Sequence, residues 1–192
     1  MSKKWTEEEI KNLVENYGKK RARIRNNGFK EDILRFGKKF IEGTEEDVKR
    51  FCEIVVKRLQ QEFLPSYPPP SVRYEEGFAD YGAYIRDKKE IWLIMPTALR
   101  RIYDGVEREN TEVILDGASK IVRYVAHEFY HYMQDIRGEL PEERSREWWQ
   151  PAPEYEREAE RFAKDANWDF YRAAKGTREN YFTNIVHEFL QN

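Results

Sequence analysis

The sequence predicts an α+β protein in which an N-terminal helical part precedes a small antiparallel sheet and further helices. Apolar residues recur at helical spacing up to residue 63, alternate with polar residues in the next thirty positions, and return to helical spacing from residue 121. A Pro-rich stretch separates the first two parts and is expected to be stiff and extended. We therefore expect a helical region at 1–64, a connector at 65–71 and a second unit at 72–192.

Length and composition narrow the class of protein. A chain of 192 residues that is 40% hydrophobic can bury one good core. The net charge of −2 argues against nucleic-acid binding through overall electrostatics. The single cysteine excludes an internal disulfide, and Cys52 lies in an apolar helical pattern where burial is its expected role. We expect a cytoplasmic protein without a membrane span, and the Lys-, Arg- and Glu-rich composition is typical of thermophilic proteins.

Three helices are expected before the connector. The first begins with a capping box in which Thr6 reaches toward Glu9. The second is expected over residues 30–41, where a glycine ends it. The third begins at the cap Thr44 and ends before Pro65, with a long apolar stripe on one face.

Three short segments after the connector are typical of strands, because β-branched and aromatic residues alternate in them and turn residues follow. They are residues 72–74, 82–86 and 91–95, with a hairpin turn at 87–90. A short helix at 98–103 and a polar loop at 104–110 are expected next.

The second unit contains the motif His-Glu-x-x-His, which holds two of the three histidines of the chain. On a helix, His127 and His131 lie one turn apart, so both imidazoles can face one ion while Glu128 points beside it. This spacing is the zincin signature. A catalytic zinc ion takes three protein ligands and leaves one position to water, whose proton an adjacent Glu can accept. The alternative is an amphipathic helix that binds nothing.

The ends of this motif helix have their own signals. Asp116 or Ser119 is expected to cap its start, and Gly138 its end. The loop that follows contains Trp148 and Trp149, which either wall a substrate cleft or cap a core, the second being the commoner role.

The helix expected next along the chain offers a third ligand. Glu156, Ala159, Glu160 and Ala163 share one face, which combines two carboxylates with two small residues that allow another helix to come close. We assign Glu156 as the third ligand and Glu160 as the carboxylate that accepts the free N–H of a ligating histidine. Glu158 is the alternative ligand, and a solvated, salt-bridged helix face is the alternative for the whole stretch.

Together the two motifs resemble the gluzincin peptidases, in which a His-Glu-x-x-His helix is followed by a helix carrying Glu-x-x-x-Asp or a close variant. Residues 156–163 are similar to the Glu-x-x-Ala-(Asp/Asn)-x-Phe-Ala pattern of ImmA/IrrE-type and HtpX-type metallopeptidases. The resemblance covers residues 72–175 and departs from the pattern at Glu160, where Asp or Asn is usual. It implies a minimal zincin-like metallopeptidase unit whose sheet lies over the metal helix and whose edge strand holds a peptide or protein substrate. It further implies one catalytic zinc at His127, His131 and Glu156, with Glu128 as general base.

Two other functions remain open at this point. Trp5 to Glu9 is similar to the start of Myb-like DNA-binding repeats, so a DNA-associated regulatory or structural protein that retains a zincin-like fold is the alternative. Its basic cluster would be Lys19, Lys20, Arg21, Arg23 and Arg25, although the rest of the Myb pattern is missing and a solvated loop is the simpler interpretation. A metal that serves folding alone would need a fourth protein ligand, and Cys52 and His187 are distant in sequence. His187 is expected on a final helix capped by Thr177, as a surface or core residue.

Overall fold

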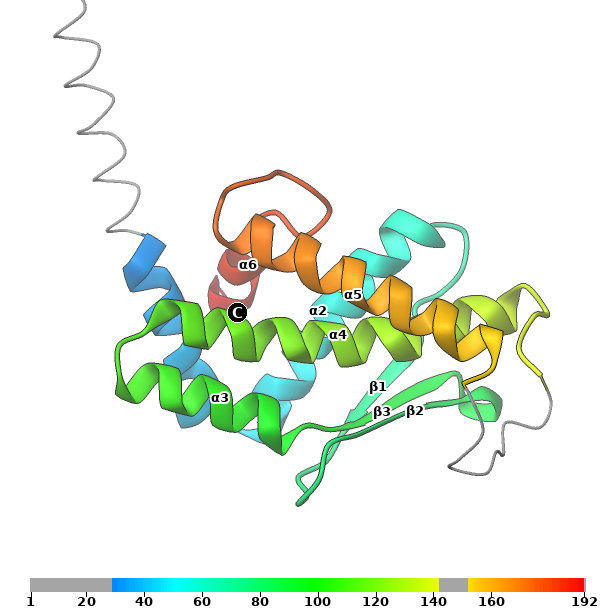
Figure 1. The fold of residues 1–192 in the computed structure, drawn as a ribbon, viewed down its shortest axis with the longest axis horizontal. Coiled ribbons are helices and arrows are strands. Elements are labelled where there is room, and N and C mark those ends of the chain that lie inside the picture. Colours follow the sequence, from blue (N-terminus) through cyan, green and yellow to red (C-terminus); the bar gives the residue numbers. More distant parts are fainter. Residues whose placement is uncertain (1–28, 142–151, 192) are drawn as a thin grey trace, which may run out of the picture.

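The computed structural model describes residues 29–141 and 152–191, and it confirms the α+β class (Figure 1). The first expected helix, the basic cluster and the two adjacent tryptophans lie outside the described residues. In chain order the elements are a helix over 29–42, α2 (Glu45–Phe63), β1 (Ser71–Tyr74), β2 (Tyr81–Ile85), the 3-10 turn η1 (Arg86–Lys88), β3 (Glu90–Ile94), α3 (Pro96–Glu107), α4 (Thr111–Ile136), α5 (Glu154–Ala174) and α6 (Ile185–Gln191).

The two helices before the connector agree with the sequence pattern. The backbone N–H of Thr44 donates to the Asp47 carboxylate at 2.9 Å, which satisfies one of the amides left free at the start of α2. The helix ends at Phe63, before Pro65. Its apolar stripe is buried, and Cys52 is fully enclosed as expected. Burial raises the pKa of the Cys52 thiol, so this side chain serves as a small core residue.

The sheet is mixed, so the expectation of an antiparallel sheet is wrong for one strand. Its order is β1-β3-β2, with β2 antiparallel to β3 and β1 parallel to β3. The β2–β3 hairpin is closed by η1 and by Lys89 in the left-handed region, a local turn that the sequence indicated. Residues 75–80 connect β1 to β2, which lie at opposite edges of the sheet. Strand β3 then pairs between these two earlier strands. The alternation of apolar and polar residues along a strand does not indicate the order of the strands in the sheet.

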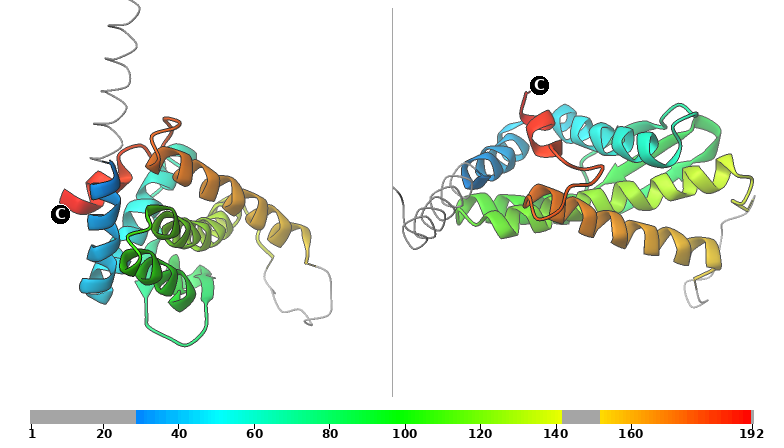
Figure 2. Two further views of the ribbon diagram at one scale, coloured as in Figure 1. Left: turned by 60° about the vertical axis from the view of Figure 1, so that its left-hand side comes forward. Right: turned by 90° about the horizontal axis from the view of Figure 1, so that it is seen from above.

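Helix α4 lies at the centre of the structure and contacts α2, α3, α5 and the inner face of the sheet (Figures 1 and 2). One apolar core runs through all of these elements, from Phe36 and Phe51 on the N-terminal side to Phe129 and Phe170. Residues on both sides of the connector therefore contribute to the same core. The division into 1–64, 65–71 and 72–192 stays a prediction.

The loop expected at 104–110 is shorter in the structure, because α3 takes up its first four residues. Helix α3 reaches Glu107, and α4 begins at Thr111 because the Asn110 side chain accepts from the amides of residues 112 and 113 at 3.1 and 3.3 Å. The expected caps Asp116 and Ser119 are wrong, since both lie inside α4. Gly117 faces α3 rather than a turn, and an added Cβ there would lie 2.9 Å from the Ala98 carbonyl oxygen. The expected C-terminal glycine is confirmed: Gly138 has a φ of 71°.

The final helix is shorter than expected. It begins at Ile185, and Thr177 does not cap it. The backbone N–H and the hydroxyl of Thr177 both lie 3.0 Å from the Arg172 carbonyl oxygen, to which they donate, so this residue closes the end of α5 after Gly176. None of the helices in residues 29–141 and 152–191 is long and apolar enough to cross a membrane.

Asp135, near the end of α4, anchors the β2–β3 hairpin to this helix. Its carboxylate accepts from the Tyr84 hydroxyl at 2.6 Å, pairs with Lys89, and lies 3.1 Å from Nε of Arg86. Burial alone would raise the pKa of Asp135, but the hydrogen bonds from Lys89 and Tyr84 and the nearby positive charges lower it overall. The ionised carboxylate therefore stabilises the fold.

Replacing Asp135 with Asn is expected to lower the free energy of unfolding by about 1–3 kcal/mol at pH 7, because the buried Tyr84 hydroxyl and the nearby Lys89 and Arg86 lose a charged acceptor. The folded pKa lies below the unfolded value of about 3.9, so this contribution is fully present above that pH and is lost as the pH falls through the folded pKa. Urea unfolding of both proteins from pH 7 to pH 3 measures the difference. The matched exposed variant Asp116→Asn should cost less than about 1 kcal/mol. A difference for Asp135→Asn that did not shrink toward pH 3 would contradict this account.

Candidate metal centre

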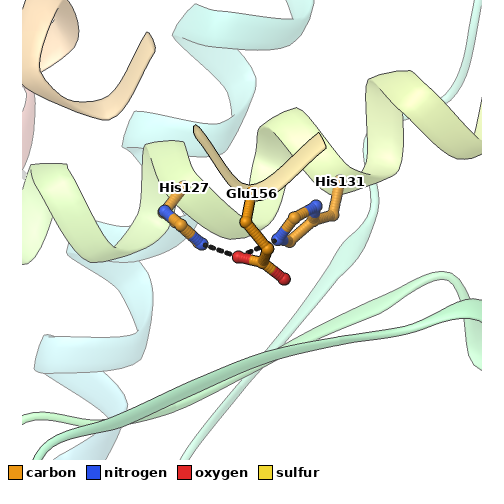
Figure 3. A group of neighbouring side chains, drawn as sticks. All are labelled: His127, His131 and Glu156. Atoms are coloured by element: carbon orange, nitrogen blue, oxygen red, sulfur yellow. Dashed lines mark ion pairs between the residues drawn. The ribbon is translucent and has the colours of Figure 1, made fainter. Parts of the chain in front are cut away.

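The structure brings His127, His131 and Glu156 together from two helices (Figure 3). The two histidines lie one turn apart on α4, with ring centroids separated by 4.9 Å. Oε2 of Glu156, on α5, lies 3.3 Å from Nε2 of His127 and 3.5 Å from Nε2 of His131. One ligand atom from each of the three residues lies within 4.8 Å of the other two. Two imidazole nitrogens and one carboxylate oxygen are a donor set that suits zinc.

Small residues on α5 explain how Glu156 reaches the histidines. Ala159 and Ala163 are fully buried, and α5 lies alongside α4 over much of its length (Figure 2). Larger side chains at these two positions would hold the helices further apart. The helix face predicted from the spacing of Glu156, Ala159, Glu160 and Ala163 is thus the face that meets α4.

The three residues form a strongly coupled charge cluster. The contact with His127, and then the contact with His131, hold the pKa of Glu156 far below its usual range. Burial lowers the pKa of His127, but the contact with Glu156 and the charges of Glu128 and Glu160 outweigh burial and raise it overall. In the metal-free protein a proton on His127 is therefore stabilised by carboxylates. A divalent cation would replace that proton, which is the behaviour expected of a metal site.

Glu128 lies beside this group and is almost fully buried, with 7% of its surface exposed. Burial raises the pKa of Glu128, although both histidines and a hydrogen bond from the Tyr84 backbone act in the opposite direction. The Glu128 side chain lines a cavity of about 400 Å³ together with His127, Glu160, Asp80 and other residues of α4 and β2. The cavity gives a small molecule or a peptide segment access to Glu128 and to one side of the group.

Gly82 on β2 allows the strand to pass directly over Glu128. A Cβ at this position would lie 2.8 Å from Oε1 of Glu128 and 3.3 Å from its Cγ. We expect Gly82→Ala to displace the Glu128 carboxylate, to cost about 1–3 kcal/mol of unfolding free energy, and to reduce any reaction that uses this carboxylate.

Urea unfolding and an activity assay check this prediction. Gly138→Ala is the matched control, because that glycine has nothing within 4 Å and a φ of 71°. Its cost should be about 1–2 kcal/mol from backbone strain alone, with activity unchanged. Equal activity of the Gly82→Ala protein and the wild type would contradict the role given to this close approach.

Two other carboxylates of α5 were considered for the site, Glu160 as the partner of a ligating histidine and Glu158 as the alternative ligand. Oε2 of Glu160 lies 3.8 Å from Nδ1 of His127, which is too long for a hydrogen bond, and the side chain pairs with Arg123 and with Lys164. Glu158, the alternative ligand, is not in the group of three. It accepts from the side chain of Gln134 at 3.3 Å.

Gln134 is the site residue that sequence reasoning missed. It lies three positions after His131 on the same helix, so its place on the histidine face could have been read from helical spacing. Neither of the other residues considered as ligands joins the group. Cys52 lies in the core, and His187 on α6 lies 3.6 Å from Asp32 at the surface.

The fold and the site define this chain as an α+β protein with a His-His-Glu group that could hold a metal ion. Beyond this class the comparisons give nothing more: no family model, no curated protein and no solved structure matches the chain. Any further step toward its activity therefore rests on the chemistry of the site.

Proposed function

We propose that this protein is a zinc-dependent peptidase of the gluzincin type, which hydrolyses peptide bonds with Glu128 as general base. The observation that carries the proposal is the meeting of Glu156, from a separate helix, with the histidines of the His-Glu-x-x-His motif. A helix that merely resembled the motif by chance would not be expected to place both of its histidines around one carboxylate from another helix.

The number of ligands favours a catalytic rather than a folding role for the metal. Structural zinc sites are closed by four protein ligands, whereas catalytic sites have three and keep a position for water or substrate. In the described part of the chain the group contains three residues. The cavity lined by His127 and Glu128 lies beside them and supplies the space that the fourth position needs.

Zinc held by His127, His131 and Glu156 would polarise the scissile carbonyl and lower the pKa of the attacking water to about 7. Glu128 would accept the proton of that water and pass it to the leaving amine. Its carboxylate is suited to both transfers because the Tyr84 backbone N–H holds it and because burial raises its pKa above the ordinary value.

The sheet offers a place for the substrate. Strand β2 pairs only with β3, so it is an edge strand of the described sheet, and it lies over α4 where Gly82 meets Glu128. An extended peptide could add to this edge through backbone hydrogen bonds, which would bring its scissile bond over the metal helix. Peptides and unfolded protein segments are therefore the proposed substrates.

Incubation with a diverse peptide mixture, read by mass spectrometry, tests the proposal. The protein is compared after zinc loading, after removal of metal by a chelator, and after zinc is returned. We expect defined cleavage products in the first and third samples and none in the second. Products that persist without metal, or no products from the zinc-loaded protein, would contradict the proposal.

A further inference from the structure

Gln134 is a buried polar residue at the contact between the two ligand helices. Only 1% of the surface of Gln134 is exposed, and only 2% of the surface of His131 is exposed. Its Oε1 lies 2.9 Å from Nδ1 of His131, and its Nε2 donates to the Tyr155 carbonyl oxygen at 3.1 Å and to Glu158 at 3.3 Å. Every polar atom of this side chain thus has a partner, which offsets the cost of burying an amide.

The partners fix the orientation of the amide. The Tyr155 carbonyl and the Glu158 carboxylate can only accept, so the NH2 group of Gln134 must face α5. Its Oε1 is then directed at His131, and because this oxygen can only accept, Nδ1 of His131 must carry a proton. In the neutral ring this leaves the lone pair on Nε2, the nitrogen that faces Glu156.

We propose that Gln134 is the positioning residue of the metal centre: it sets the Nδ1-protonated form and the ring orientation of His131, and it ties that ligand to the helix that supplies Glu156. Its two contacts on α5, Tyr155 and Glu158, come before and after Glu156 in the sequence. One side chain therefore contacts a metal ligand on α4 and two near neighbours of the ligand on α5. The inference rests on the proposed metal centre and adds a residue to it.

The surroundings of His127 indicate why Gln134 is expected to affect metal affinity more than Glu160 does. The contact from Nδ1 of His127 to Glu160 is 3.8 Å, and Glu160 is also paired with Arg123 and Lys164. The His131–Gln134 contact is short and buried, and both Nε2 donations of the amide are directed at α5. The outer partner of a ligating histidine raises metal affinity when it holds the ring in place, so the larger effect is expected at Gln134.

The test uses Gln134→Met, which keeps the length of the side chain and removes its hydrogen bonds. In metal-free protein, ¹⁵N NMR of the imidazole nitrogens reports which nitrogen of His131 is protonated. We expect Nδ1–H in the wild type and a mixture of the two forms in the variant. Zinc affinity, measured by competition with a chromophoric chelator, should fall by about 10–100-fold.

A second variant separates this role from a general loss of packing. Gln60→Met is the matched control, because Nε2 of Gln60 on α2 also donates to two acceptors, here backbone carbonyls at 3.0 and 2.7 Å, away from the site. It should leave the form of His131 and zinc affinity unchanged. The protonation of His131 in the wild type is measured independently of the variants, so it decides the question even where Gln134→Met does not fold.

The inference is overturned if His131 of the wild type is protonated at Nε2 instead of Nδ1. It is equally overturned if a folded Gln134→Met protein binds zinc as tightly as the wild type. Failure of the wild type to bind zinc would instead contradict the proposed function. The NMR result in metal-free protein would still show whether Gln134 sets the protonated nitrogen of His131.

Discussion

Replacing Glu128 with Gln is expected to leave zinc bound while peptide hydrolysis falls by about 10²–10⁴-fold or below detection. The amide has the same shape and can still accept the Tyr84 N–H, so the fold around α4 and β2 should persist. It cannot take a proton from water at neutral pH. Because Glu128 is not in the group of three ligands, zinc content should stay that of the wild type.

The measurement is hydrolysis of a peptide found to be cleaved by the wild type, with zinc content determined on the same preparation. Glu53→Gln is the matched control, because Glu53 is an exposed residue of α2 that pairs with Lys49 at 3.8 Å, away from the site. It should hydrolyse the peptide at the wild-type rate. Hydrolysis retained in a clean Glu128→Gln preparation would remove Glu128 from the mechanism.

The second large effect concerns the ligands themselves. Glu156→Gln and His131→Ala are each expected to weaken zinc binding by more than about 100-fold, which exceeds the effect of losing an outer partner. Glu156 is the residue that meets both histidines, and a neutral amide lacks the charge that compensates a divalent cation. Each variant should also lose hydrolysis, because a ligand that binds and positions the metal is missing.

Competition with a chelator gives the affinities, and circular dichroism shows that each variant is folded. Glu154→Gln is the control on the same helix: Glu154 is exposed and pairs with Arg157 and Arg161. Zinc affinity of this control should match the wild type. A folded Glu156→Gln protein with wild-type affinity would rule out Glu156 as a ligand and would turn attention to Glu158.

The sequence predicted the parts of the site that depend on helical spacing alone. The interval between His127 and His131 determines that both rings leave α4 on one side, and the alanines of α5 marked the face that meets it. Spacing does not determine which partner a side chain chooses once two helices meet. Glu160 was expected to orient a histidine, yet Arg123 and Lys164 compete for it, and the buried partner of His131 is Gln134.

The fold was predictable to a similar degree. Strands and most helices follow from local pattern, but the place of β3 between β1 and β2 depends on how the sheet packs over α4. A glycine was another source of error. Gly105 lies in the loop expected at 104–110, whereas in the structure it lets α3 and α4 approach closely, which is a property of two helices together.

Elemental analysis of the purified wild-type protein, after reconstitution with zinc and removal of the excess, shows whether the protein binds zinc. We expect one zinc ion per chain, held by His127, His131 and Glu156. A folded wild-type protein that retains no zinc under these conditions would contradict both the metal centre and the proposed peptidase.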